Sequence, residues 1–297
     1  MSLVVESKHP EAATYGNNRA WKARLALGYR QRSDKTVLSK MQFEGPLRVQ
    51  RPFYPEHGRC HTYLLHPPGG MVSGDQIDID VSVDSNANAF ITTPSAGKIY
   101  SADSANVVQT QNIQLSVSDG ASLEFLPQEN ILFNGANARL STTIEVSAKG
   151  RLIAWDMVSF GRPYGGYWFD SGSLSQQISI SIEGDLVLHE GFRTDPELVI
   201  LESSVGLMGY KHMGSLFIAV PEEEDLYKTW VELIRQHMSA LDIKDTSIGA
   251  THRHKLLIVR ALSQDVEQLR NTFISIWQHI RPQVLGAEPI MPRIWLT

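Results

Sequence analysis

The sequence predicts a mainly β fold, with a large β-helical or antiparallel-rich body and a small C-terminal α/β portion. Short stretches of alternating apolar and polar residues follow one another from residue 21 to about residue 205. Turn signals separate several of these stretches, and no helical pattern lies between them. We therefore predict a disordered N-terminal tail (1–20), a β-rich body (21–205) and an α/β portion (206–297) packed on the same body.

The first strands of the body are predicted from loose alternation and from breaks in the chain. In "WKARLALGYR" the apolar residues at 21, 23, 25 and 27 share one face. Pro52 and Pro55 stop a later stretch, because proline cannot donate to a β ladder. In chain order the strand candidates are "WKARLALGYR", "KTVLSKMQFEG", "LRVQRPFY" and "CHTYLLHPPGG".

The stretch "DQIDIDVSVDS" shows the strictest alternation in the chain. Its isoleucines and valines occupy every second position, as in a strand with one buried face. Asp78 and Asp80 lie between them and are expected on a solvated face. This stretch begins directly after Asp75, so that carboxylate should stand at the start of the strand.

The remaining strand candidates complete the body. The pairs Asp119-Gly120, Lys149-Gly150 and Glu183-Gly184 are turn signals that separate several of them. A coiled β-solenoid and a sandwich both fit this order, and the spacing is too irregular for a sequence repeat. The candidates are "AFITTP", "NVVQTQNIQLSVSDG", "ASLEFLP", "ARLSTTIEVSAKG", "RLIAWDMVSF", "SLSQQISISIEG" and "DLVLHEGF".

The last part of the chain changes character. "SLFIAV" and "HKLLIVRAL" are typical of strands. Between them, "PEEEDLYKTWVELIRQHM" predicts a helix near 222–239, with Pro221 at its start and carboxylates in its first turn. "SQDVEQLRNTFISIWQHIRP" predicts a second helix near 264–281, with Ser263 as N-cap and Pro282 beyond its end.

Composition excludes several classes of partner. The chain has 297 residues and a net charge of -5, without the basic surface that nucleic acid or anionic lipid requires. No apolar run reaches membrane-spanning length, and Leu3-Val4-Val5 is too short for the core of a signal peptide. Cys60 is the single cysteine, so no internal disulfide can form. We expect a cytoplasmic protein in a reducing compartment.

The stretch "HPPGGMVSGD" (66–75) combines two prolines, three glycines and a terminal carboxylate. A phosphate-binding loop needs a helix N-terminus after the glycines, whereas a clear strand follows here. Two prolines and a Gly-Gly pair are explained by a rigid turn. The turn alone does not explain why a carboxylate, Asp75, ends it.

Six blocks occur in an order that is informative about function. They are "GPLRVQRPFYPE" (45–56), "YLLHPPGGMVSGD" (63–75), "TTPSAGKIY" (92–100), "LPQENILFNGAN" (126–137), "AWDMVSFGRP" (154–163) and "PRIWLT" (292–297). Together they resemble the urease accessory protein family UreD, also called UreH. The resemblance covers the chain from about Trp21 to its last residue.

The resemblance implies a non-enzymatic scaffold or chaperone for nickel insertion into apo-urease. Members of the family bind UreF, which recruits the GTPase UreG, and are placed against apo-urease. It implies a β-helical fold with a few helices, a hetero-oligomer with two copies in the accessory complex, and no permanently bound cofactor. Nickel would be in transit, and an internal passage has been proposed for it. The alternatives are a β-rich hydrolase and a binding module unrelated to metal delivery.

Two carboxylates are the first candidates for a metal passage. Asp75 in "VSGD" and Glu190 in "LVLHEGF" adjoin glycines in otherwise apolar or tight segments. A buried carboxylate needs a partner or water, and oxygen ligands suit divalent ions. A passage also needs weak sites, because a tight site retains the ion. Asp156 in "AWDMVSF" is a third candidate, and a salt bridge or turn hydrogen bond is the structural alternative for all of them.

Histidines and the cysteine form a second set. "HGRCH" brings His57, Cys60 and His61 together, with His66 beyond, and these side chains suit Ni²⁺ or Zn²⁺. However, neighbours on a strand face opposite sides, so Cys60 and His61 should not share a site. "THRH" places two further histidines, His252 and His254, on one strand face, where solvated edge residues are equally expected. No motif of a known catalytic class is found, and a triad assembled from distant residues stays open.

Overall fold

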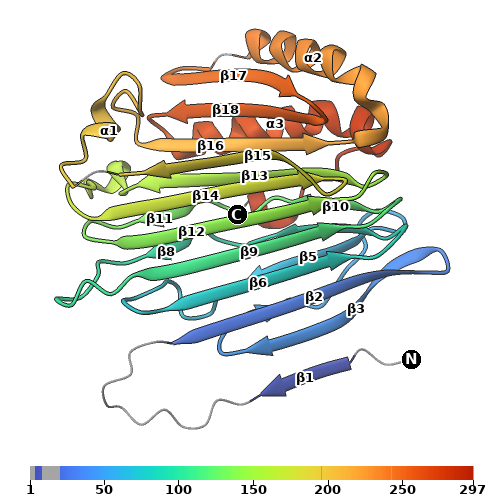
Figure 1. The fold of residues 1–297 in the computed structure, drawn as a ribbon, viewed down its shortest axis with the longest axis horizontal. Coiled ribbons are helices and arrows are strands. Elements are labelled where there is room, and N and C mark those ends of the chain that lie inside the picture. Colours follow the sequence, from blue (N-terminus) through green and yellow to red (C-terminus); the bar gives the residue numbers. More distant parts are fainter. Residues whose placement is uncertain (1–3, 9–20, 195, 242, 297) are drawn as a thin grey trace.

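Two β-sheets that face each other form most of the structure (Figure 1). The computed structural model describes residues 4–8, 21–194, 196–241 and 243–296. The first sheet has the order β1 (Val4–Lys8), β3 (Lys35–Glu44), β2 (Lys22–Arg32), β6 (Gln76–Val83), β9 (Gln109–Val117), β12 (Asn137–Val146), β14 (Ser173–Ile182) and β15 (Asp185–Arg193).

The second sheet has the order β17 (Thr246–Arg253), β18 (Leu256–Ser263), β16 (His212–Ala219), β13 (Arg151–Phe160), β10 (Ser122–Phe125), β7 (Asn88–Thr92), β5 (Cys60–Leu65) and β4 (Arg48–Val49). Two short strands, β8 (Gly97–Ile99) and β11 (Asn130–Leu132), pair with each other, and β11 also pairs with β13. The predicted mainly β fold is confirmed.

The middle of the chain alternates between the sheets and so forms a flattened β-helix. Strands β6, β9, β12 and β14 are parallel neighbours in the first sheet, and β7, β10 and β13 are parallel neighbours in the second. The turns at Asp119-Gly120 and Lys149-Gly150 lead the chain from the first sheet to the second. Only Glu183-Gly184 makes a hairpin among the three predicted turn pairs. Antiparallel pairs lie at the ends of the coil, at β2–β3 and β14–β15 in the first sheet and at β4–β5, β13–β16, β16–β18 and β17–β18 in the second.

The N-terminal segment differs from the prediction at one place. Residues Val4–Lys8 form β1, which pairs in parallel with β3 at the edge of the first sheet. The rest of the predicted disordered tail, residues 1–3 and 9–20, lies outside the described residues.

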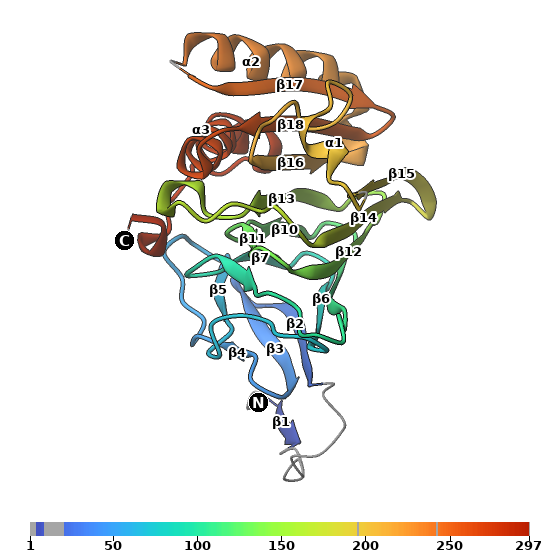
Figure 2. The ribbon, with the colours of Figure 1, turned by 90° about the vertical axis from the view of Figure 1, so that its left-hand side faces the viewer.

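Two apolar cores lie on opposite faces of the second sheet. The first core fills the space between the sheets and contains Ile77, Ile79, Val81 and Val83, as the alternation in β6 predicts. The second core lies between the other face of the second sheet and two helices, α2 (Tyr227–Ala240) and α3 (Val266–Leu285). Figure 2 shows both helices beside β16, β17 and β18. No helix in the described residues is both long and apolar enough to cross a bilayer.

Both predicted helices are present, with different ends. A short 3₁₀ helix, η2 (Pro221–Leu226), precedes α2. The N-cap of α3 is Asp265 instead of Ser263, because its carboxylate accepts the N–H groups of Glu267 and Gln268 at 2.7 and 3.2 Å.

Pro282 lies inside α3, whereas the sequence predicted it beyond the helix end. It occupies the last turn, where the loss of one backbone N–H removes one hydrogen bond near the frayed end. The helix then ends at Gly286, which is left-handed and donates to the carbonyl of Pro282 at 3.1 Å. Other described segments are α1 (Val199–Glu202), η1 (Pro163–Gly165) and η3 (Arg293–Leu296).

Candidate functional site

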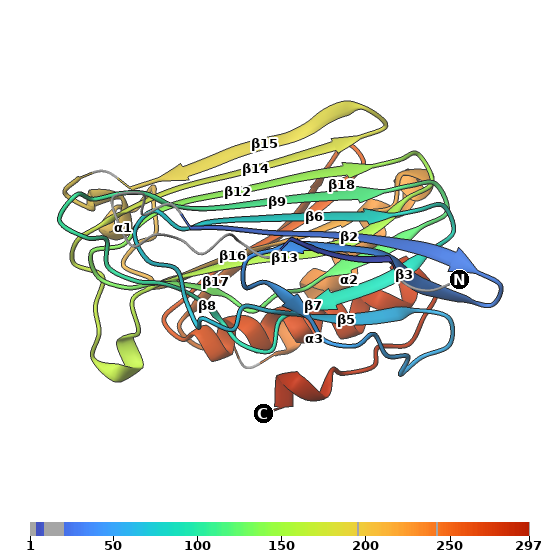
Figure 3. The ribbon, with the colours of Figure 1, turned by 90° about the horizontal axis from the view of Figure 1, so that it is seen from below.

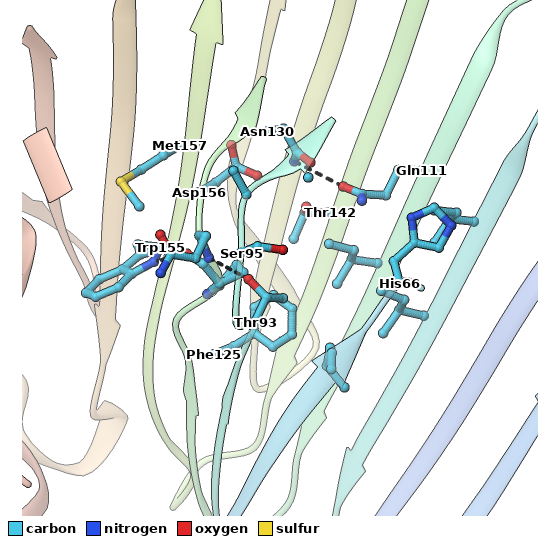
Figure 4. A pocket seen from close by; sticks show the side chains of 18 of the residues that line it. His66, Thr93, Ser95, Gln111, Phe125, Asn130, Thr142, Trp155, Asp156 and Met157 are labelled. Atoms are coloured by element: carbon cyan, nitrogen blue, oxygen red, sulfur yellow. Dashed lines mark hydrogen bonds between the residues drawn. The ribbon is translucent and has the colours of Figure 1, made fainter. Parts of the chain in front are cut away.

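A cavity of about 120 Å³ lies between the two sheets. Strands β6, β9 and β12 line it from one side, and β10 and β13 from the other. Most of the lining is apolar, which follows from the inward faces of the strands. The polar side chains, most of which Figure 4 shows, are His66, Thr93, Ser95, Lys98, Gln111, Gln128, Asn130, Thr142 and Asp156.

Asp156 is a largely buried ionisable group of this site. On β13 the neighbours two positions away, Ala154 and Val158, are buried in the core between the sheets, so Asp156 takes an inward position. Its carboxylate accepts a hydrogen bond from Gln176 Nε2 at 2.5 Å. Burial and, to a smaller extent, the nearby charge of Glu190 together raise its pKa to about 6, against the Gln176 hydrogen bond, which lowers it. An aspartate at such a position lowers the stability of the fold, because its charged form is removed from water. This cost suggests that the residue is kept for a function.

A second, open cleft of about 530 Å³ adjoins this cavity. Its walls come from β15 on one side and from β16, β17 and β18 on the other. Asp156 and Ile178 line both spaces, so the two meet at the Asp156 carboxylate. Glu190 on β15 also lines the cleft and forms an ion pair with Arg260 on β18. Among the described residues that line this cleft, Arg260 is the one cation.

Oxygen ligands lie one after another along the cleft and the cavity. Asp156, Glu190, Gln176, Ser215 and the Gly-rich backbone around them are oxygen-bearing groups of the kind that divalent ions accept. Arg260 neutralises Glu190, which weakens any cation site there. No group of three or more His, Cys, Asp or Glu side chains in the described residues is arranged to hold a metal ion. The geometry fits a weak, passing interaction better than retention.

The predicted candidates are only partly brought together. Glu190 and Asp156 line the same cleft, and the sequence ranked Asp156 below Glu190 and Asp75. Sequence reasoning missed Gln176 and Arg260. The two are separated from Asp156 by 20 and 104 positions along the chain, and neither follows a motif.

Asp75 lies elsewhere, in the turn that precedes β6. Its side chain is buried, and Oδ2 accepts the backbone N–H of Val72 at 2.8 Å. Its own N–H donates to the Val72 carbonyl at 3.0 Å, and Gly74 is left-handed. Burial raises the pKa of Asp75, and the Val72 hydrogen bond lowers it. Met71 and Ile77 on either side line the cavity, whereas Asp75 is not part of that lining. A passage role for Asp75 stays a prediction.

Substitutions of Asp75 distinguish a structural role in the turn from a role in a metal passage. Asp75→Ala leaves the Val72 N–H without its part-buried acceptor, so we expect the free energy of unfolding to fall by about 1 kcal/mol. Asp75→Asn retains an acceptor oxygen and should unfold at nearly the wild-type urea concentration. The nickel content of urease activated with the Asn variant decides the matter. A turn role predicts normal nickel content, and a passage role predicts reduced nickel content with normal stability.

Cys60 and His61 face opposite sides of β5, as strand alternation requires. Cys60 is buried in the core between the sheets, and burial raises the pKa of its thiol. His61 points to the other face, stacks on Phe90 at 4.5 Å between ring centroids and contacts Glu56 Oε1 through Nε2 at 2.8 Å. The two therefore do not form one metal site.

The other histidines and aspartates are also separate. His57 is exposed, and His66 lines one part of the cavity, where burial lowers its pKa. His252 lies on β17, but His254 follows in the turn with φ 50°, so the two do not share a strand face. Asp78 and Asp80 lie on the outer face of the first sheet, where Asp80 pairs with Arg24 at 3.0 Å.

A buried charged network under α3 was not found from the sequence. Glu124 on β10 accepts hydrogen bonds from Trp277 Nε1 at 2.7 Å and from Arg281 Nε at 2.8 Å. Arg281 also donates to Glu56 at 2.7 Å, and Arg59 lies 3.3 Å from Glu124. Burial would raise the pKa of Glu56, but the His61 hydrogen bond and the charges of Arg281 and Arg59 lower it to about 2. We name these residues the buried network, and it joins α3 to the coil.

The charges of the buried network could have been noticed in the sequence. Glu124 interrupts the apolar run "ASLEFLP", and Arg281 ends the apolar stripe of the second helix. Each is an uncommon residue at a core position. Their pairing could not be foreseen, because 157 positions separate them.

The fold and the site define a class of protein. It is a two-sheet β-helical protein whose interior carries a mainly apolar cavity with several polar side chains, and this cavity meets an open cleft at a largely buried carboxylate. The sequence profile of the UreD urease accessory protein family matches residues 22–296. The chain belongs to this family.

Individual relatives are similar to this chain over nearly their full length. The Urease accessory protein UreD of Hahella chejuensis is 38% identical over 97% of this chain and 94% of its own. That of Pseudomonas entomophila is 36% identical over the whole of both chains. That of Klebsiella aerogenes is 37% identical over 94% of this chain and 98% of its own.

Proposed function

We propose that the chain is an accessory protein required for nickel insertion into apo-urease. Its match to the UreD family from residue 22 to residue 296 is the observation that carries this proposal. The relatives at 36 to 38% identity are named for an accessory role toward urease. In this role the chain catalyses no reaction and binds no permanent cofactor. It works in the cytoplasm as a scaffold or chaperone.

The assembly that we propose links a nickel donor to an acceptor. The chain binds UreF, through which the GTPase UreG joins, and it contacts apo-urease. Two copies take part in the accessory complex. Neither nucleic acid nor membrane is a partner, in keeping with the net charge of -5 and the lack of a basic surface.

Nickel is the cargo, and the interior supports a route for it. A hydrated divalent ion in the open cleft meets Glu190 first and then the buried Asp156 carboxylate. Arg260 competes with the ion for Glu190, which keeps the residence time short. Beyond Asp156, the cavity offers Gln111, Asn130 and Thr142 as neutral oxygen ligands, with Asn130 donating to Gln111 at 3.2 Å (Figure 4). Neutral ligands hold a cation weakly and allow it to leave.

Co-purification with UreF tests the proposed linkage. A tagged chain co-expressed with UreF from the same operon is expected to retain UreF through gel filtration. Expressed alone, the chain should aggregate more readily, because an exposed apolar surface then has no partner. A chain that is folded and abundant but never retains UreF would count against the proposal.

A further inference from the structure

Two connections at one end of the sheets expose a concentration of apolar side chains. One joins β13 to β14 (161–172), and the other joins β15 to β16 (described residues 194 and 196–211). Both lie at the end marked by α1 in Figures 1 and 3. Trp168 is 50% exposed and Val205 is 90% exposed. We name the exposed apolar residues of these connections the aromatic surface; they are Tyr164, Tyr167, Trp168, Val199, Val205 and Met208.

Hydrogen bonds hold the backbone of both connections in place. The Asn134 side-chain oxygen accepts the N–H groups of Asp170 and Ser171 at 2.9 and 2.8 Å. In the second connection, Gly209 N–H donates to the carbonyl of Leu201 at 2.8 Å. Ordered segments therefore present large apolar side chains to solvent. Tyr and Trp in such positions are typical of the energetic centre of a protein interface.

A hollow of about 240 Å³ lies between the two connections and carries negative charge. Its floor contains Phe160, Phe169, Leu198, Leu201 and Tyr210, and Trp168 stands at its side. The carboxylates in its lining are Asp170, Glu197 and Glu202, against one cation, Lys211, which pairs with Glu202 at 2.9 Å. Three carboxylates and one lysine leave a net charge of -2. An aromatic wall beside carboxylates fits a cationic side chain with an apolar stem.

The aromatic surface adjoins the open cleft. Gly206 and Leu207, which lie between Val205 and Met208, line the cleft that contains Glu190 and Asp156. A protein bound on the aromatic surface would therefore also cover the rim of that cleft. A partner bound here would thereby shield an ion that passes through the cleft from bulk solvent.

We propose that the aromatic surface is a docking site for a partner protein that presents an Arg or Lys side chain among apolar side chains. The cationic side chain enters the hollow between Asp170 and Glu197, and Trp168 packs against its stem. Apolar neighbours of the partner cover Val205 and Tyr164. That the partner belongs to the urease assembly rests on the proposed function, whereas the chemistry of the docking site does not.

The test compares two double variants with a matched control. Trp168→Ala/Val205→Ser removes the apolar centre, and Asp170→Asn/Glu197→Gln removes charge from the hollow. Trp21→Ala/Val72→Ser serves as control, since Trp21 is 45% and Val72 53% exposed, outside the aromatic surface. Each chain is tagged and co-expressed with UreF and with apo-urease in turn. Retention is measured at low and high salt, and circular dichroism confirms the fold.

We expect the apolar double variant to lose about tenfold or more of its binding to one of the two proteins. The charge variant should weaken the same binding and reduce its dependence on salt. The control should bind as the wild type. Wild-type retention of both proteins by the apolar variant would overturn the docking site. An unaffected charge variant would overturn the cationic partner. Failure of the wild-type chain to retain either protein would count against the proposed function instead.

Discussion

Replacing Arg281 by methionine is expected to lower the free energy of unfolding by about 3 to 5 kcal/mol. Arg281 and Glu124 are both 0% exposed, and the guanidinium donates to both oxygens of the Glu124 carboxylate, at 2.8 and 2.9 Å. Methionine would leave that carboxylate charged, buried and with Arg59 as its remaining cation at 3.3 Å. The urea midpoint of the purified variant, or its soluble fraction if folding fails, measures the effect.

Two further variants separate burial from charge. Arg24→Met removes an ion pair with Asp80 on the outer face of the first sheet, and exposed pairs of this kind contribute less than about 1 kcal/mol. Arg281→Met/Glu124→Gln removes both charges of the buried pair and should recover part of the loss. Equal destabilisation by Arg24→Met and Arg281→Met would contradict the role given to the buried network.

Replacing Asp156 by asparagine is expected to stabilise the chain and to reduce nickel delivery. The pKa of Asp156 is raised from 3.8 to about 6, so the folded state binds the proton more tightly than the unfolded state does. The resulting cost is absent below pH 4, grows as the pH rises, and is complete above about pH 6. At pH 7 it amounts to about 3 kcal/mol, from a rise of about 2.2 in the pKa. Asparagine removes this cost and can still accept the Gln176 hydrogen bond.

Urea unfolding at pH 4 and pH 7 measures the predicted gain in stability. The nickel content of urease measures the predicted loss of nickel delivery. The gain in stability should be large at pH 7 and small at pH 4. Asp80→Asn, on the outer face of the first sheet, is the control and should leave nickel content unchanged. A stable Asp156→Asn chain that supports normal nickel content would exclude Asp156 from the route.

The elements were predictable where a local pattern carries the physical cause. The alternation in 76–83 predicted which side chains of β6 face the core, because one sheet face is buried. Both long helices were predictable, because signals for a helix start or end flank each of them. The strand pattern alone left a coiled β-solenoid and a sandwich open, because an Asp-Gly or Lys-Gly turn looks the same whether the next strand joins the same sheet or the facing one. The end of the second helix was predicted wrongly at Pro282, because one proline in the last turn of a helix destabilises that helix only slightly.

The site was predictable only in part. Glu190 and Asp156 stood out as carboxylates in apolar segments, and the structure brings both to one cleft. Asp75 stood out for the same reason, yet its carboxylate contacts the Val72 amide in a turn. The local sequence indicates that a carboxylate is buried. Its contacts, however, depend on which distant strands pair with its own strand. Arg260 and Gln176 come to the cleft through such pairing, as β18 and β14 add to their sheets.

The central claim is that this chain is needed to load nickel into urease. Its most direct test is the nickel content of urease purified from cells that carry all the urease genes, with and without the gene for this chain. The account predicts assembled urease in both cases, with nickel near its full complement when the chain is present and almost none when it is absent. Equal nickel content and equal urease activity in the two preparations would contradict it.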